Sequence, residues 1–251
     1  MTFMQKLNAL TKFALALVLL VGTAYGQSAN SGYPYSQVSV PGITQYTFVA
    51  EKSSTTLASI TSPSLTLPSG ALVGVYCRGP AALTSITVTS NPSTTWTQET
   101  LQSFSGQQAA QLSIGSPAAG ATTFTCSPNT SSGFQSMIVF VATGTLGTIN
   151  TTVGSAVTSA ASVTSPAFTT SGRTLTIMCA GTVSLSSTYT PGVMGGIVGA
   201  IGAASLGSIG GIGADGVCES AIIPYAAPGA TAVVSASPSS YWTETVVAIN
   251  Y

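Results

Sequence analysis

Short runs in which apolar and polar residues alternate predict β-strands along most of the chain. The segment TSITVTS (84–90) places Ile86 and Val88 on one face and threonines on the other, and RTLTIMC (173–179) repeats the pattern. Alternation of this kind is typical of a strand with one buried face. Clusters of Ser, Pro, Gly and Asn separate such runs at intervals of about eight to twelve residues. The pattern therefore predicts an all-β fold, an antiparallel two-sheet β-sandwich.

The pattern also repeats along the chain and predicts two related halves. ASITSPSLTLPSGALVGVYC (58–77) matches ASVTSPAFTTSGRTLTIMC (161–179) with one residue deleted, and residues 119–144 match residues 228–251. One strand pattern recurs as YTFVAE, IVFVAT and TVVAIN, and its middle copy ends the first half and opens the second. Because separate tandem domains would not share a strand, we expect a single domain.

The first residues of the chain predict export. An apolar stretch (13–24) follows two lysines, and Ala24 and Gly26 are small residues at the positions that a signal peptidase recognises. We therefore expect a signal peptide over residues 1–26, cleaved before Gln27, and a secreted or extracellular protein, periplasmic or cell-surface settings included. An uncleaved anchor is the alternative.

The remaining chain divides into a lead and one domain. Residues 27–44 are polar, contain Pro and Gly and show no strand pattern, so we expect a flexible N-terminal lead. The β-sandwich domain is predicted over residues 45–251, with related halves at about residues 45–142 and 138–251.

Charged side chains are scarce, which limits the functions open to the chain. They make up 4% of its residues and histidine is absent, whereas a typical domain has about 25% charged residues. Lys6 and Lys12 are two of the five basic residues, so the exported part carries three basic and five acidic side chains. Three scattered cations exclude nucleic acid as a partner. So few charges predict a weak dependence of folding on pH and salt and favour self-association or adhesion.

Four cysteines in an exported chain predict two disulfides. Cys77 and Cys179 close equivalent segments of the repeat, and alternation turns both of them and Cys126 inward. We favour the pairs Cys77–Cys126 and Cys179–Cys218, one within each half. A Cys77–Cys179 bridge and four buried free thiols are the alternatives. We expect no metal or cofactor, because the chain has neither a Cys-x-x-Cys pair nor a histidine.

Carboxylates are the main catalytic groups that the sequence leaves to consider, because a Ser-Lys site would need Lys52, for which a solvated ion pair with Glu51 is the favoured interpretation. The absence of histidine excludes Ser-His-Asp and Cys-His sites, whereas glycoside hydrolysis requires only two acids. The candidate acids are Glu99, Asp215, Glu219 and Glu244. They form no evident cluster, and we expect Glu99 and Glu244 to face water on their strands. The sequence therefore favours a protein that is not an enzyme.

Two tryptophans are the candidate ligand contacts, together with Glu99. Trp96 and Trp242 lie near acidic residues, and an exposed indole there would suit a sugar ring. An isolated Trp in a sandwich is more often part of the core, and the repeat places Trp242 opposite Phe134. We favour the core for both tryptophans and keep a sugar-binding platform as the alternative.

The glycine-rich run GVMGGIVGAIGAASLGSIGGIGADG (192–216) carries no charge before Asp215. Its length and its G-x-x-x-G spacings suit a transmembrane helix, but its ten glycines make a poor one. Strands that match the first half follow it directly. We therefore expect no stable membrane span in the mature chain, and a glycine-rich hairpin and loop at one sheet edge, exposed as an adhesive contact surface.

The order of the segments resembles that of a little-characterised group of secreted and phage-associated bacterial β-sandwich domains, which are jelly-roll-like. The resemblance is carried by SGALVGVY, TTWTQE, AAGATTFTCS and the closing WTETVVAINY. It covers about residues 45–251 and implies an extracellular or surface role. The cysteines and the glycine-rich run depart from the group, and no catalytic residue is carried over.

These observations favour a secreted, non-enzymatic β-sandwich protein with a surface-structural, adhesive or matrix-assembly role. The expected partners are a glycan, a cell-surface polymer or a second copy of the chain. A carbohydrate-binding module is the main alternative, and a glycoside hydrolase with paired carboxylates is the less favoured one.

Overall fold

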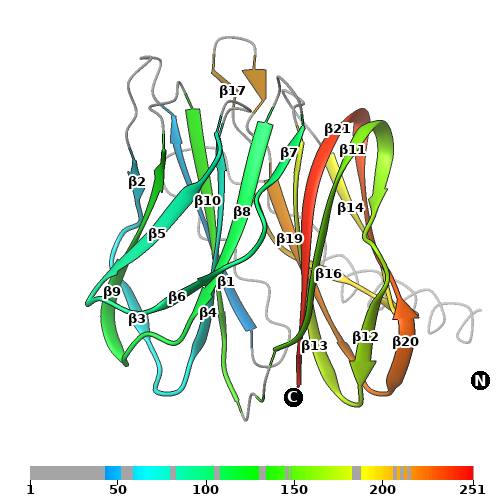
Figure 1. Ribbon diagram of the computed structural model, residues 1–251, viewed down its shortest axis with the longest axis horizontal. Coiled ribbons are helices and arrows are strands. Elements are labelled where there is room, and N and C mark those ends of the chain that lie inside the picture. Colours follow the sequence, from blue (N-terminus) through cyan, green and yellow to red (C-terminus); the bar gives the residue numbers. More distant parts are fainter. Residues whose placement is uncertain are drawn as a thin grey trace, which may run out of the picture. The chain divides into compact units, whose positions relative to one another are not determined.

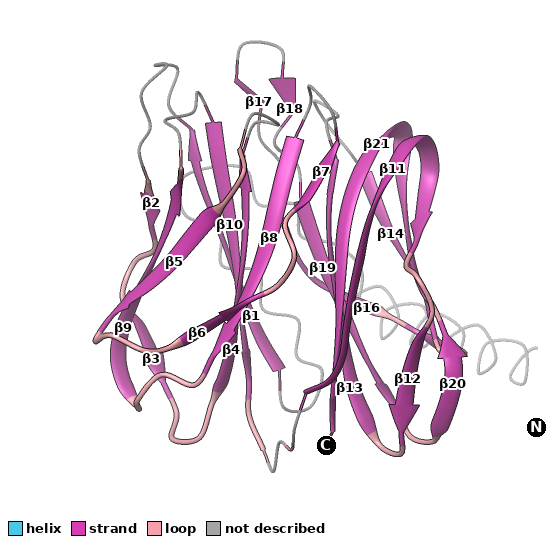
Figure 2. Ribbon diagram, viewed as in Figure 1, coloured by secondary structure: helices cyan, strands magenta, loops and turns pink. Residues whose placement is uncertain are grey.

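The computed structural model shows an all-β arrangement, as the alternating pattern predicted (Figures 1 and 2). It describes residues 43–51, 59–79, 83–104, 108–129, 134–144, 147, 149–182, 188–205, 208–209, 212–213 and 216–250. The signal peptide, its cleavage site between Gly26 and Gln27 and nearly all of the predicted lead lie outside these residues. So does Asp215.

The described residues form strands of very different lengths. The strands up to residue 142 are β1 (Ile43–Glu51), β2 (Ile60–Thr61), β3 (Leu65–Leu67), β4 (Leu72–Gly79), β5 (Ile86–Asn91), β6 (Trp96–Gln98), β7 (Gln102–Phe104), β8 (Gln108–Gly115), β9 (Gly120–Pro128) and β10 (Phe134–Ala142). The later strands are β11 (Ile149–Thr164), β12 (Phe168–Ser171), β13 (Thr174–Thr182), β14 (Thr188–Met194), β15 (Ile197–Val198), β16 (Ala200–Ser205), β17 (Ser208–Ile209), β18 (Ile212–Gly213), β19 (Gly216–Ile223), β20 (Ala226–Ala230) and β21 (Ala232–Asn250).

Two large antiparallel sheets have matching strand orders. The six-stranded sheet has the order β1-β10-β4-β8-β6, and β7 also pairs with β8. In the seven-stranded sheet, β11-β21-β13-β19-β16 follow the same order, while β14 and β15 extend the sheet along the first part of β21. A four-stranded sheet contains β2, β3, β5 and β9, and the pairs β12–β20 and β17–β18 stand apart. None of these sheets closes on itself.

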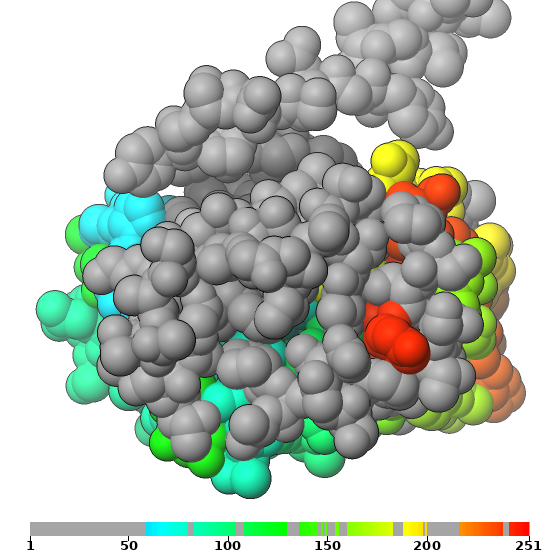
Figure 3. All heavy atoms as spheres, turned by 90° about the horizontal axis from the view of Figure 1, so that it is seen from above, coloured from blue at the N-terminus to red at the C-terminus, as the bar shows by residue number. Residues whose placement is uncertain are grey.

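Three apolar cores join the sheets face to face. The first core, with Val75 and Phe124, lies between the four-stranded and six-stranded sheets. The second, with Phe140 and Val247, lies between the two large sheets, and the third, with Met178, lies on the far side of the seven-stranded sheet. Figure 1 shows the layers from left to right: β9, then β4 and β8, then β13 and β19, then β12 and β20. From above, the earlier described residues lie on the left and the later ones on the right (Figure 3).

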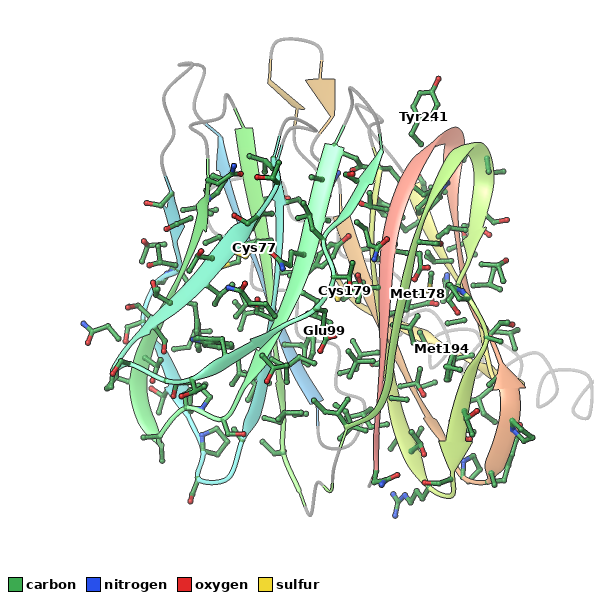
Figure 4. The ribbon with its side chains drawn as sticks, in the orientation of Figure 1. Cys77, Glu99, Met178, Cys179, Met194 and Tyr241 are labelled. Atoms are coloured by element: carbon green, nitrogen blue, oxygen red, sulfur yellow. A yellow bond between two sulfur atoms is a disulfide. The ribbon has the colours of Figure 1, made fainter. Side chains whose placement is uncertain are left out.

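Two disulfides are present, and they join the strands in different ways (Figure 4). Cys77 of β4 pairs with Cys126 of β9 and links two sheets across the first core. Cys179 of β13 pairs with Cys218 of β19, the residue directly opposite on the neighbouring strand. These are the pairs that the sequence favoured.

A one-residue difference between the repeated segments explains why the two bridges differ. The deletion falls just before the turn that leads into β13, in the segment that corresponds to residues 67–68. Because side chains alternate along a strand, a shift of one residue turns them to the opposite face. Cys77 therefore lies in the first core and faces the four-stranded sheet. Cys179 instead lies in the second core, between the two large sheets.

Two serines of the repeated Thr-Ser-Pro sequence form the same pair of backbone contacts. The Ser62 N–H donates to the carbonyl of Phe124 at 2.8 Å, and the N–H of Phe124 donates to Ser62 Oγ at 3.0 Å. Ser165 and Ala232 form the same two bonds at 2.9 and 3.0 Å. The recurring sequence thus produces the same local structure in both parts of the chain.

The described part of the glycine-rich run forms short strands and turns. A turn at Gly195 and Gly196 separates β14 from β15, and both glycines have positive φ angles, 53° and 88°. Such angles favour glycine because a Cβ atom would clash with the backbone. The run then continues as β16, which pairs with β19 at the edge of the seven-stranded sheet. It therefore connects the outer strand β14 to that edge.

Candidate functional site

Trp96 and Glu99 lie at and just after β6, on the edge of the six-stranded sheet. Trp96 is half-buried and packs its ring edge against Phe124, with ring centroids 5.8 Å apart and an interplanar angle of 83°. Glu99 is half-exposed, and its backbone is fixed to β8, because its N–H donates to the carbonyl of Leu112 at 2.9 Å. The indole of Trp96 thus belongs mainly to the first core.

Trp242 is fully buried in the third core. Its relative exposure is 0%, its Nε1–H donates to the carbonyl of Ala160 at 2.9 Å, and its ring meets Tyr189 edge to face at 6.3 Å. Trp242 therefore presents no surface to a ligand, and the two tryptophans lie in different cores.

Glu244 does not face water, contrary to the expectation from its strand position. Both Glu244 and Glu219 are 0% exposed. The side chain alternates onto the third core because Trp242 and Val246, two residues away on either side, lie there. Alternation places Glu244 on the same face as Trp242, for which the sequence favoured the core, so the expectation that this charged residue faces water was wrong. Every residue from Trp242 to Ile249 is buried, so neither face of this part of β21 is exposed.

Burial raises the pKa of Glu219 and of Glu244 to about 7. Each carboxylate has one hydrogen-bonded oxygen, which opposes that rise. Gly192 N–H donates to Glu219 Oε2 at 3.2 Å, and Ser155 Oγ donates to Glu244 Oε1 at 2.7 Å. The second oxygen of each has no partner among the described residues. Both carboxyls therefore hold a proton more tightly than an acid in water.

The two buried acids do not form a catalytic pair around a cavity. Glu219 lies opposite Met178, and Glu244 lies opposite Ala180, so strand β13 runs between them. Glu99 lies on the other large sheet. None of the described candidate acids lines either of the two shallow grooves of the described surface. The arrangement offers no acid and base on either side of a substrate bond.

A buried polar cluster joins the two large sheets. Arg78 Nη2 donates to the carbonyl of Thr182 at 2.8 Å and also bonds Gln108 Oε1. Gln108 Nε2 donates to the carbonyl of Gly181 at 2.9 Å. Burial raises the pKa of the nearby Tyr76 phenol to about 12, although the positive charge of Arg78 acts in the opposite direction. The donors of Arg78 and Gln108 on one sheet reach backbone carbonyls of the other sheet, so the cluster suits a structural link between the two sheets.

Two shallow grooves lie on the described surface. One, of about 400 Å³, lies beside β6 and is lined by Thr94, Thr95 and Thr97 among others. The other, of about 310 Å³, lies between the Gly195–Gly196 turn and residues 227–231. We call the second one the glycine groove. Neither is lined by a charged described residue.

Exposed hydroxyl groups form a regular array on the four-stranded sheet. On β9, alternate residues from Thr123 onward face outward, and the same holds on β5 and β2. Thr61, Thr125 and Thr89 lie side by side across three strands, and Thr61 Oγ1 is 2.8 Å from Thr125 Oγ1. We call this array the first hydroxyl face. Its members are Thr61, Thr87, Thr89, Thr123, Thr125 and Ser127.

A second array covers the opposite outer layer. Ser162 of β11, Ser235 of β21 and Thr190 of β14 lie side by side, in the same manner as the three threonines of the first face. We call this array the second hydroxyl face. Its members are Ser162, Thr164, Thr188, Thr190, Ser235 and Ser237. Both outermost sheet surfaces of the described chain therefore present hydroxyl groups and no charge.

Comparison of the chain with protein-family models, with curated proteins and with solved structures gives no match. These comparisons identify no family, so the resemblance to secreted bacterial β-sandwich domains stays an expectation. In the described part of the chain, no group of three or more His, Cys, Asp or Glu residues is placed to hold a metal ion.

The described residues include no helix that is long and apolar enough to cross a membrane.

Sequence reasoning missed an exposed aromatic residue next to the glycine groove. Tyr225 is 45% exposed, and its hydroxyl donates to the carbonyl of Gly195 at 2.6 Å. Val193, at 46%, is the other large apolar side chain exposed nearby. Tyr225 lies between two strands and belongs to no periodic pattern, so only its place after a Pro, a turn signal, marks it in the sequence.

Proposed function

We propose that the protein is a secreted, non-enzymatic adhesion module whose outer sheet faces bind a neutral, hydroxyl-rich polymer. The observation that carries the proposal is the pair of hydroxyl faces, one on each outermost layer. Threonine and serine side chains on adjacent strands recur about every 5 Å across a sheet and about every 7 Å along a strand. Such an array forms many weak hydrogen bonds to a repeating surface.

The charge distribution supports a neutral partner. Among the residues whose burial is described, Arg78, Glu219 and Glu244 are buried, and Arg173 and the half-exposed Glu99 lie at the surface. A charged polymer would find no patch of opposite charge on the hydroxyl faces. A neutral polymer can bind there without removing water from a charged side chain of either face. A disulfide-linked fold suits an oxidising, non-cytoplasmic setting.

The proposal includes the architecture of one β-sandwich protein built from two related halves. Support comes from the matching orders β1-β10-β4-β8-β6 and β11-β21-β13-β19-β16. The equal hydrogen bonds of Ser62 and Ser165 support it as well. A duplicated unit would also explain why both outer layers carry a hydroxyl face.

Adsorption to insoluble polymers tests the proposal. Residues 27–251 are mixed with cellulose, chitin and cell-wall polymer, and the protein left in solution is measured. We expect saturable adsorption to at least one neutral polymer. Adsorption to none of them would overturn the proposal.

Lysine substitutions locate the adsorbing surface. Thr89→Lys and Thr190→Lys place one charge on each hydroxyl face, and we expect the double variant to adsorb about tenfold more weakly. The control is Ser69→Lys with Ser116→Lys, which adds the same charge at exposed loop and turn positions. Equal adsorption of the two double variants would assign the binding to another surface.

A further inference from the structure

We infer that the glycine groove is a binding site for one ring of a neutral saccharide, stacked beside Tyr225. The inference goes beyond the hydroxyl faces, because it assigns a separate concave site to a soluble ligand. Its volume of about 310 Å³ is at the lower end of the range for small-molecule pockets.

Tyr225 is anchored beside the groove by its hydroxyl, which contacts two of the glycines that line the groove. Its hydroxyl donates to the carbonyl of Gly195, and a Cβ atom at Gly196 would lie 2.7 Å from the same hydroxyl. The absence of a side chain at Gly196 therefore makes room for the tyrosine. Because the ring is tethered and still 45% exposed, a ligand that stacks on it does not have to immobilise it first.

The walls of the groove favour a neutral, polar ligand. Gly195, Gly196 and Gly229 have no side chains, so peptide groups form much of the wall, and Thr231 adds a hydroxyl. None of the described residues that line the groove is charged. A sugar ring has apolar C–H faces for Tyr225 and Val193, and hydroxyl groups for the peptide groups, whereas a phosphate or carboxylate would meet no cation.

The groove adjoins the second hydroxyl face. Val233 lines the groove and lies opposite Thr164, a member of that face. Val193 lines it from β14, the strand that carries Thr190. A polymer chain along the second hydroxyl face can therefore place its terminal ring in the groove.

Titration with soluble neutral oligosaccharides tests the inference. The probes are cello-, xylo-, manno- and chito-oligosaccharides, added to residues 27–251 and followed by amide chemical shifts. We expect one series to bind with a dissociation constant of about 1 mM or lower and to shift the amides of Gly195, Gly196 and Gly229. No binding, or shifts confined to other residues, would overturn the inference.

Tyrosine variants provide the second arm. We expect Tyr225→Ala to weaken binding about tenfold or more, and Tyr225→Phe, which keeps the ring and loses the tether, to weaken it less. The matched control is Tyr241→Ala, because Tyr241 is also exposed, at 37%, and points away from the strands at the top of Figure 4. Equal loss in both alanine variants would contradict the site.

This test can fail independently of the proposed function. If oligosaccharides do not bind while the polymer still adsorbs, the inference falls and the adhesion proposal stands. If oligosaccharides shift the groove amides while no polymer adsorbs, the groove stands and the adhesion proposal falls.

Discussion

At the scale of single residues, hydrogen bonding separates two tryptophans that look alike in the sequence. The indole N–H of Trp242 bonds the carbonyl of Ala160, whereas the Nε1 of Trp96 has no hydrogen-bond partner among the described residues. Removal of Trp242 Nε1 would leave the partly buried carbonyl of Ala160 without this donor, and an unsatisfied group away from water costs more than a lost contact.

We therefore predict unequal losses from the same substitution. Trp242→Phe is expected to lower the free energy of unfolding by about 2–4 kcal/mol, through the lost volume and the unpaired carbonyl. Trp96→Phe, which breaks no hydrogen bond to a described residue, is expected to lower it by about 1 kcal/mol. Urea unfolding of both variants measures the difference, and equal losses would contradict the assigned roles.

The two buried carboxyls are expected to make stability depend on pH, which differs from the weak dependence that the low charge count predicts. Their pKa is about 7 in the folded chain against 4.5 for the ordinary group. Between these values the unfolded chain releases the protons and the folded chain retains them. The free energy of unfolding therefore falls as the pH rises from about 4.5 to about 7, by about 3 kcal/mol for each carboxyl, and falls no further above that range.

Glu219→Gln is predicted to remove about half of this pH dependence. Glutamine keeps an acceptor for the N–H of Gly192 but does not titrate, so the variant should be the more stable protein at pH 8 and similar to the parent at pH 4.5. Urea unfolding across that range measures the effect. Glu99→Gln is the control at a half-exposed position, and a Glu219→Gln profile identical to that of the parent would refute the prediction.

At the scale of elements, the face of the strand on which a cysteine lies decides which other cysteine it can reach. The repeat indicates that Cys77 and Cys179 are equivalent, and in the alignment they are. One residue fewer before β13 nevertheless turns Cys179 toward the other large sheet, where Cys218 on the adjacent strand is its partner. Alternation predicted the strands and their buried positions. Which sheet a buried residue of the next strand faces depends on the length and geometry of the turn before that strand.

Loss of either bridge is predicted to lower stability by a similar amount. The bridges span 49 and 39 residues, and loops of these lengths correspond to about 4 kcal/mol each in the chain-entropy account. Urea unfolding of Cys77→Ala with Cys126→Ala, and of Cys179→Ala with Cys218→Ala, tests this. A loss below about 1 kcal/mol for either pair would show that the bridge does not restrict the unfolded chain.

At the scale of the whole molecule, much of the fold and less of the site could be predicted. Alternation and turn residues predicted the all-β class, and the cysteine count, the repeat and alternation predicted the two disulfides. They did not predict the burial of Glu244, because a charged side chain is expected in water, whereas both faces of this part of β21 are covered. Nor did they predict the groove at Tyr225, because a groove depends on how distant segments meet. The duplication, export and adhesion stay predictions.

The polar contacts between the large sheets predict cooperative unfolding. Gln108 and Arg78 on one sheet bond backbone carbonyls of the other, and the second core joins both sheets. We therefore expect one transition for the whole domain. Trp242 fluorescence in Trp96→Phe and Trp96 fluorescence in Trp242→Phe report the two sheets separately. Within each variant, the fluorescence midpoint should equal that from far-ultraviolet circular dichroism, and different midpoints would show that the two large sheets unfold independently.

The salt dependence of polymer adsorption tests the central claim most directly. Between about 0.01 M and about 1 M NaCl, the screening length falls from about 30 Å to about 3 Å. Adsorption through uncharged hydroxyl faces should be unchanged over this range. The absence of adsorption at any salt concentration, or its loss as the salt concentration rises, would contradict the account.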